Sequence, residues 1–284
     1  MHYIQLAPQQ AAIIAVLAGV GFLALTARRH ERVPGAARLA LREIAIAMAL
    51  LALWGVVGIV TIRHVAGATA HGDWVWAAER TAHLPSEAAV QAPLLAHVTL
   101  TQAANFYYLY GHLNVIAALL IWLFWRHRDD YAWVRATLVL FTLASTLLQS
   151  LPVAPPRLLP GLGVVDTPAL YHQSVYSPLG TGSADQLAAM PSIHVGWAIL
   201  AAVVVLQVST SRWRWLVLLH PVLMSLVVVD TGNHFWADGI VAGMLLLPAL
   251  AAGPACVAWA AARRRSAAKP ALVPEPAMAT SSRA

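Results

Sequence analysis

Long apolar runs separated by short polar stretches dominate the chain. Each run is about 17 to 27 residues long, which is enough for a helix to cross the hydrocarbon core of a bilayer. The pattern predicts an all-α integral membrane protein, a transmembrane bundle of six to seven helices. The runs cover residues 11–27, 41–62, 105–125, 132–148, 190–208, 213–229 and 235–261.

Two stretches between the runs do not fit a membrane span. Residues 64–101 hold Trp74, Trp76 and several polar side chains, a composition typical of the membrane–water interface. We therefore expect an interfacial segment before the third span. Residues 151–188 are rich in Pro and Gly and too broken to span.

Composition agrees with this picture. Hydrophobic residues make up 60% of the 284 residues and charged residues only 11%, against about 25% charged residues in a soluble domain. The net charge of +6 comes from Lys and Arg between apolar runs, so we expect a membrane partner and no nucleic acid. Cys256 is the one cysteine, which excludes an internal disulfide.

The basic residues give the bundle a direction. Alternating the seven spans places 15 of the 18 Lys and Arg residues on one side, and only Arg63, Arg80 and Arg157 on the other. Loops rich in Lys and Arg stay in the cytoplasm. The chain is thus predicted to be a multi-pass plasma (cell) membrane protein with a cytoplasmic C-terminus. The expected parts are 1–103 (two spans and the interfacial segment), 104–262 (the transmembrane core) and 263–284 (a disordered basic cytoplasmic tail).

Three polar segments are predicted on the extracytoplasmic side. They are residues 152–157, 190–194 and 231–238. One helix out and one helix back returns the chain to the same face, so segments far apart in sequence can meet there. The candidate residues in them are Arg157, Ser192, His194, Asn233, His234 and Asp238.

The residue types in these segments suit an anion. His234 and Asp238 are four apart, so a helix would place them on one face, and a carboxylate can fix the tautomer of a histidine and stabilise its charged form. Pro191 and Ser192 resemble a helix start, and the region of Asn233 offers a second one. Free N–H groups at a helix N-terminus bind anions, and an arginine adds a planar donor fork suited to phosphate.

At these residues the sequence resembles the type 2 phosphatidic acid phosphatase superfamily, which also includes certain haloperoxidases. The similarity covers roughly residues 107–243. It looks closest to the branch with inositol phosphorylceramide synthase, because this chain has the Gly-Asn-His version of the third motif that resembles that branch. The superfamily has a basic motif ending in Arg-Pro, a Pro-Ser-x-His and a His-x-x-x-Asp. Here they stand in that order as Arg157, Pro191-Ser192-Ile193-His194 and His234-Phe235-Trp236-Ala237-Asp238.

The resemblance implies a role for each residue. His234 would attack phosphorus and form a phosphohistidine, Asp238 would orient it, and His194 would protonate the leaving oxygen. Arg157, Ser192 and Asn233, the last at the second helix start, would bind the phosphoryl oxygens. A lipid phosphate would be the substrate, and no metal or other cofactor would be required.

The sequence departs from the family pattern at three positions. Ser150 stands where the first motif often has Lys, Leu158 follows Arg157 in place of Pro, and Val228 stands where many members have Arg. The site therefore has fewer cations than the phosphatase pattern. Either another group compensates, or the substrate carries less charge, as a phosphodiester does.

A further polar strip precedes the motifs. Asn105, Tyr108 and His112 are three and four residues apart, so they share one face of a helix. We expect them near the same membrane face, as a possible headgroup or acceptor pocket. A satisfied interfacial pair is an equally good interpretation of Tyr108 and His112.

Several alternatives remain open at the level of sequence. The acceptor can be water, which gives a lipid phosphatase, or an alcohol, which gives a headgroup phosphotransferase. The His and Asp residues can instead bind a divalent metal or carry protons or ions across the membrane. They can also be a buried polar pair that only joins two helices. The oligomeric state is not predicted.

Overall fold

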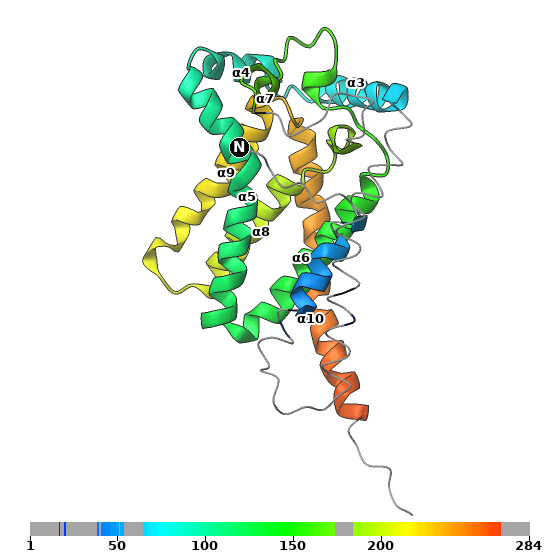
Figure 1. Cartoon of the computed structure of the whole chain (residues 1–284), viewed down its shortest axis with the longest axis vertical. Helices are drawn as coiled ribbons and strands as arrows, with labels where there is room; N and C mark the ends of the chain where they lie inside the picture. Colours follow the sequence, from blue (N-terminus) through cyan, green and yellow to red (C-terminus); the bar gives the residue numbers. More distant parts are fainter. Residues whose placement is uncertain are drawn as a thin grey trace, which may run out of the picture.

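The computed structural model describes residues 65–173 and 184–267, together with residues 41–50, 52 and 53 and the isolated positions 17, 20 and 39. The first predicted span, part of the second and most of the C-terminal tail lie outside the described residues, so these predictions are not tested. The described part is helical (Figure 1). Its extended pairing is a single parallel bridge between Val153 and Ala188.

The helices follow the predicted runs closely. Short 3-10 turns, η2 (Pro156–Leu158), η3 (Ala184–Leu187) and η4 (Arg212–Leu218), lie between or before them. The α-helices are α3 (Val65–Thr81), α4 (Glu87–Leu95), α5 (Val98–Arg126), α6 (Arg128–Leu148), α7 (Thr167–Leu170), α8 (Ile193–Val208), α9 (Leu219–Asp230) and α10 (Trp236–Ala267).

Four helical segments are long and apolar enough to cross a membrane. They are Val98–Arg126, Arg128–Leu148, Arg212–Asp230 and Trp236–Arg263. α8 is apolar too, at 16 residues. The third, fourth, sixth and seventh predicted runs are thereby confirmed as candidate spans, and the fifth as an apolar helix. The chain is a multi-pass helical membrane protein.

The long helices pack around an apolar core. Phe141 of α6, Leu200 of α8 and Leu246 of α10 are almost completely buried and belong to one apolar cluster. α6 and α10 approach closely at Gly253, where a Cβ would lie 2.0 Å from Thr137 Oγ1. Small residues allow helix backbones to approach in membranes, where packing drives association.

The two ends of the bundle differ. In Figure 1, α3 lies across the end of the bundle where α8 and α10 begin, and α4 and α7 lie at the same end. At the opposite end lie the α5–α6 junction with Arg126 and Arg128, and η4 with Arg212 and Arg214. These four arginines are thus separated from the motif segments. The interfacial position of α3 and the cytoplasmic assignment stay predictions.

Candidate active site

The three motif segments meet at one end of the bundle. The Ser192 N–H donates to the Asp238 carbonyl at 3.1 Å, and the Arg157 N–H donates to the Gly232 carbonyl at 3.1 Å. Backbone contacts therefore join the second motif to the third and the first motif to the third. The three segments, far apart in sequence, thus meet in space as expected, and their location at one membrane face stays a prediction.

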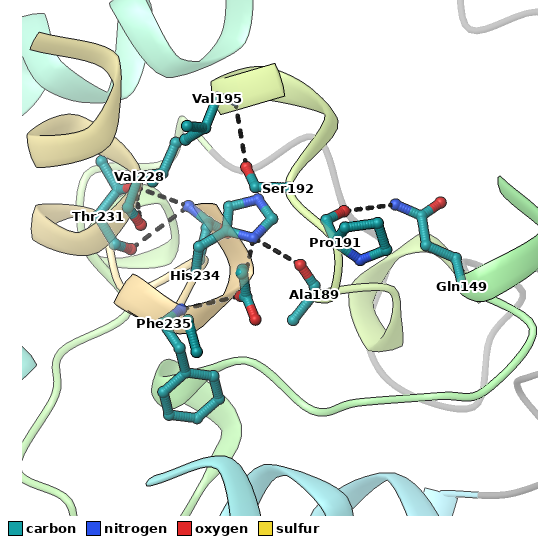
Figure 2. Close-up of polar contacts among 12 residues, drawn as sticks. Gln149, Ala189, Pro191, Ser192, Val195, Val228, Thr231, His234 and Phe235 are labelled. Carbon is teal, nitrogen blue, oxygen red and sulfur yellow. Dashed lines mark hydrogen bonds and ion pairs between the residues drawn. The ribbon is translucent and has the colours of Figure 1, made fainter. Parts of the chain in front are cut away.

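His234 is held by two acceptors. Its Nδ1 lies 2.8 Å from the Ala189 carbonyl oxygen and 3.1 Å from Asp238 Oδ2 (Figure 2). A carbonyl oxygen can only accept, so Nδ1 must carry the hydrogen. The lone pair of the neutral ring is then on Nε2, which is the state that a nucleophilic imidazole needs.

Asp238 is fully buried and lies in the first turn of α10. Its Oδ2 accepts from the Phe235 N–H at 2.9 Å as well as facing His234. The helix begins at Trp236, so His234 precedes it and the pair is not stacked on a regular helix face as the spacing suggested. The carboxylate still reaches the ring, because it binds a free N–H at the helix start.

His194 lies in the first turn of α8, inside a cluster of rings. Its ring stacks on Tyr108 with a centroid distance of 4.4 Å and meets the His112 ring edge-on at 4.2 Å. The His234 ring is 5.5 Å away. His194 Nδ1 is buried and forms no hydrogen bond within the described part of the chain, which calls for an explanation in a native site.

Ser192 is the N-cap of α8, as the sequence predicted. Its Oγ accepts from the Val195 N–H at 3.4 Å, and its side chain is fully buried. The Gln149 side chain, at the end of α6, donates to the Pro191 carbonyl at 3.1 Å (Figure 2). The start of α8 is thus fixed from both sides.

Arg157 and Asn233 bind each other. Arg157 Nε donates to Asn233 Oδ1 at 2.9 Å, and the Asn233 amide donates to Thr231 Oγ1 at 2.9 Å. Arg157 Nη1 donates to Asp166 Oδ2 at 2.9 Å and to Gln186 Oε1 at 3.2 Å. Asn233 therefore lies against the guanidinium, and its binding of phosphate stays a prediction.

Gly232 makes the turn before His234 possible. Its φ is +72°, and a Cβ there would lie 2.9 Å from Val164 Cγ1 and 3.0 Å from Arg157 Cβ. Glycine adopts this backbone conformation without steric cost. The turn brings the first motif against the third.

The residues of the predicted polar strip on α5 contact two different parts of the structure. Tyr108 and His112 contact His194, as described above. Asn105 instead binds the loop that carries α7: its Oδ1 accepts from Thr167 Oγ1 at 2.7 Å and its Nδ2 donates to Gln173 Oε1 at 2.9 Å.

Sequence reasoning missed the polar side chains that support the site from α3 and α4. Gln91 donates to the Val165 carbonyl at 2.9 Å and to the Asp230 carbonyl at 2.8 Å, and it is fully buried. His71 Nδ1 donates to the Pro152 carbonyl at 2.8 Å. A buried glutamine has no local signature in the sequence, so its partners, far along the chain, could not be foreseen.

Glu79 is a second unforeseen neighbour. Its Oε1 accepts from the Ala237 N–H at 2.6 Å, in the first turn of α10, and its side chain is 2% exposed. Glu87 is equally buried, and Arg80 lies 3.3 Å from each carboxylate. Burial, aided by the hydrogen bond with Glu87, raises the pKa of Glu79 from 4.5 to about 8, against the opposing effect of the Ala237 N–H.

Replacing Glu79 with glutamine should remove a pH dependence of stability. The folded state holds a proton on Glu79 that the unfolded chain releases above about pH 4.5, so the free energy of unfolding falls as pH rises from 4.5 to 8. Glu79→Gln mimics the neutral carboxyl at every pH. Its unfolding temperature should equal that of wild type near pH 4.5 and exceed it by several degrees above pH 8, at roughly 2–4 °C per kcal/mol. The prediction is contradicted if the difference in unfolding temperature between Glu79→Gln and wild type is the same at every pH.

The imidazoles do not form a ready metal site. Across residues 65–173 and 184–267, no three His, Cys, Asp or Glu side chains converge in a metal-binding arrangement. His112 and His194 contact each other through their ring edges and faces. Within this cluster His194 Nδ1 is buried without a hydrogen-bond partner in the described part of the chain.

Comparison with known proteins agrees with the motif geometry. A family model described as the PAP2 superfamily matches residues 73–252, more than half of the chain. The match is longer than the similarity expected from the motifs and takes in α4 and about half of α3. Neither the curated proteins nor the solved structures gave a match. Members of this superfamily are generally phosphatases or phosphotransferases. The chain, a membrane-embedded enzyme of this kind, belongs to the PAP2 superfamily.

Proposed function

We propose that the protein transfers a phosphoryl group or phospho-headgroup of a lipid through a phosphohistidine on His234. The observation that carries this proposal is the pair of acceptors on His234 Nδ1, the Ala189 carbonyl and Asp238 Oδ2. Together they leave Nε2 unprotonated and stabilise the positive charge that forms on the ring when it is phosphorylated.

The first half-reaction forms the phosphohistidine. His234 Nε2 attacks phosphorus, the bond from phosphorus to the leaving oxygen breaks, and His194 gives that oxygen a proton. The unsatisfied nitrogen of His194 supports this role, because a general acid needs a site for a proton that the protein does not already use. Arg157 and the N-terminus of α8 at Ser192 stabilise the phosphoryl oxygens.

The second half-reaction restores the enzyme. Water or an alcohol attacks the phosphohistidine, His194 takes the acceptor's proton, and the bond from phosphorus to nitrogen breaks. Tyr108 and His112 line the side of His194, where a headgroup or an acceptor alcohol would bind. The resemblance of Gly232-Asn233-His234 to the third motif of the inositol phosphorylceramide synthase branch favours an alcohol acceptor, and water is the other outcome.

An apolar groove supports a lipid substrate. It has a volume of about 650 Å³ and runs among α8, α9 and α10, from Pro85 to Leu247. Val195 and Phe235, which follow His194 and His234 in the chain, both line it. A hydrocarbon chain in the groove would contact Val195 and Phe235, one residue along the chain from each histidine.

The location completes the proposal. The motif segments lie at the end of the bundle opposite to Arg126, Arg128, Arg212 and Arg214. If those arginines face the cytoplasm, the reaction takes place at the extracytoplasmic face of the plasma membrane and the C-terminus is cytoplasmic.

The test is an assay of the full chain in lipid nanodiscs with a panel of lipid phosphomonoesters and phosphodiesters. Phosphate release and headgroup transfer are measured with and without inositol or glycerol, in the presence of a chelator or of vanadate. We expect activity that survives the chelator and is blocked by vanadate, an analogue of the pentacoordinate phosphorus. Activity lost with chelator and restored by zinc would instead support the metal-site alternative.

A further inference from the structure

Arg157, the arginine of the first motif, already has an anionic partner. Its Nη1 is 2.9 Å from Asp166 Oδ2, and the guanidinium side chain is only 2% exposed, against 28% for the Asp166 side chain. Asn233 and Gln186 also accept hydrogen bonds from it. The cation that would bind the phosphoryl group is thus paired with a carboxylate before any substrate arrives.

The position of Asp166 is built into the fold. Asp166 is the N-cap of α7, and its Oδ1 accepts from the Ala169 N–H at 3.0 Å. The preceding residue, Val165, is held on both sides by Gln91, which accepts from its N–H at 2.7 Å and donates to its carbonyl at 2.9 Å. Because α4 and α7 both hold Val165 and Asp166 in place, the fold itself fixes the position of the ion pair.

The charge of the site follows from this pair. Ser150 and Val228 stand where many family members have cations, and Asp166 neutralises Arg157. A phosphoryl group next to this pair feels the attraction of the guanidinium and the repulsion of the carboxylate. Both the attraction and the repulsion are about twice as large for two negative charges as for one, so Asp166 removes the advantage that the guanidinium alone would give a doubly charged group.

We propose that Asp166 sets the charge preference of the site, so that it favours a phosphorus group with one negative charge, as in a phosphodiester, over a doubly charged phosphomonoester. This inference rests on the proposed function, because it takes Arg157 to bind the phosphoryl oxygens. It assigns Asp166 as a specificity residue that acts through Arg157.

The test compares Asp166→Asn with wild type in the nanodisc assay. The quantity measured is the ratio of kcat/KM for a short-chain lipid phosphomonoester to kcat/KM for a phosphodiester lipid. Removing one unit charge a few ångström from the phosphorus should raise this ratio by about tenfold or more. The inhibition constant of orthovanadate should fall in the same variant.

Two control variants separate charge from structure. Asp166→Glu keeps the charge, and Thr167→Val keeps Asp166 but loosens α7 by removing the bond to Asn105; both should leave the ratio within about twofold of wild type. An unchanged ratio in Asp166→Asn, or an equal rise in Thr167→Val, overturns the inference. If wild type itself shows no vanadate-sensitive transfer, the proposed function fails instead.

A measurement on wild type decides the matter should Asp166→Asn fail to fold. A phosphomonoester gains its second negative charge near pH 6, whereas a phosphodiester keeps one charge throughout. Protonation of the free enzyme affects both kcat/KM values equally and therefore cancels in their ratio. The ratio of phosphomonoester to phosphodiester should then fall as pH rises through about 6, because the phosphomonoester gains its second charge there. A ratio that rises or stays flat contradicts the inference.

Discussion

Replacing His234 with alanine should lower kcat by about 10³-fold or more, the usual cost of removing a nucleophile. In the proposed mechanism the His234 ring is the group that attacks phosphorus. Its Nδ1 contacts with Ala189 and Asp238 serve to keep Nε2 unprotonated for that attack. Acid-quenched wild type incubated with labelled lipid phosphate would lose the label, because phosphohistidine is labile to acid. Alkaline quenching should retain it.

A second variant protects this test against misfolding. His234→Asn keeps an amide donor near the position of Nδ1 while removing Nε2, so Asp238 and Ala189 keep a partner. His97→Ala is the matched control, since His97 is exposed at the same end of the bundle and caps α5 without a side-chain hydrogen bond. Full turnover or retained alkali-stable label in His234→Asn would refute the phosphohistidine.

Replacing Gly196 with alanine should destabilise the helix bundle, because the added methyl group has no room. A Cβ at Gly196 would lie 2.0 Å from Phe141 Cζ and 2.6 Å from Phe141 Cε1, and the ring is fully buried. Overpacking a core costs about 1–3 kcal/mol and sometimes more, so we expect the unfolding temperature to fall by roughly 5–10 °C. α8 also carries His194, so activity should fall at temperatures where the protein remains folded.

Two variants check the physical cause. Gly243→Ala is the control, because its Cβ would meet only Ile199 Cδ1, at 3.8 Å, and its unfolding temperature should match that of wild type. Phe141→Leu removes the ring atoms that clash, so the double variant Gly196→Ala/Phe141→Leu should lose less stability than the two single variants added together. Additive losses would show that the contact with Phe141 is not the cause.

The spans could be predicted from sequence because each one satisfies its own backbone. A membrane helix makes its hydrogen bonds within the segment, so the apolar run itself contains the information, and α6 ends at Leu148 where the run ends. The cap at Ser192 and the contact of His234 with Asp238 are local as well. These features depend on residues three or four apart.

The remaining parts of the site are long-range and polar. Gln91 meets Asp230 across 139 positions, and Arg157 meets Asn233 across 76. No periodicity connects such residues, since each bond depends on how the helices pack. Asp166 left a weak signal that could have been used: Asp-Thr-Pro is typical of a helix start, and it does begin α7.

The position of α3 and α4 has a consequence for cutting the protein into parts. Ala68 and His71 bind the first motif segment, Glu79 binds the start of α10, and Gln91 binds the segment before Asp166 and the end of α9. A fragment that begins at α5 would keep every motif residue and lose the hydrogen bonds by which α3 and α4 hold these segments. We therefore expect the smallest autonomous enzyme to begin no later than α3, because residues outside the spans help to hold the three motif segments in place.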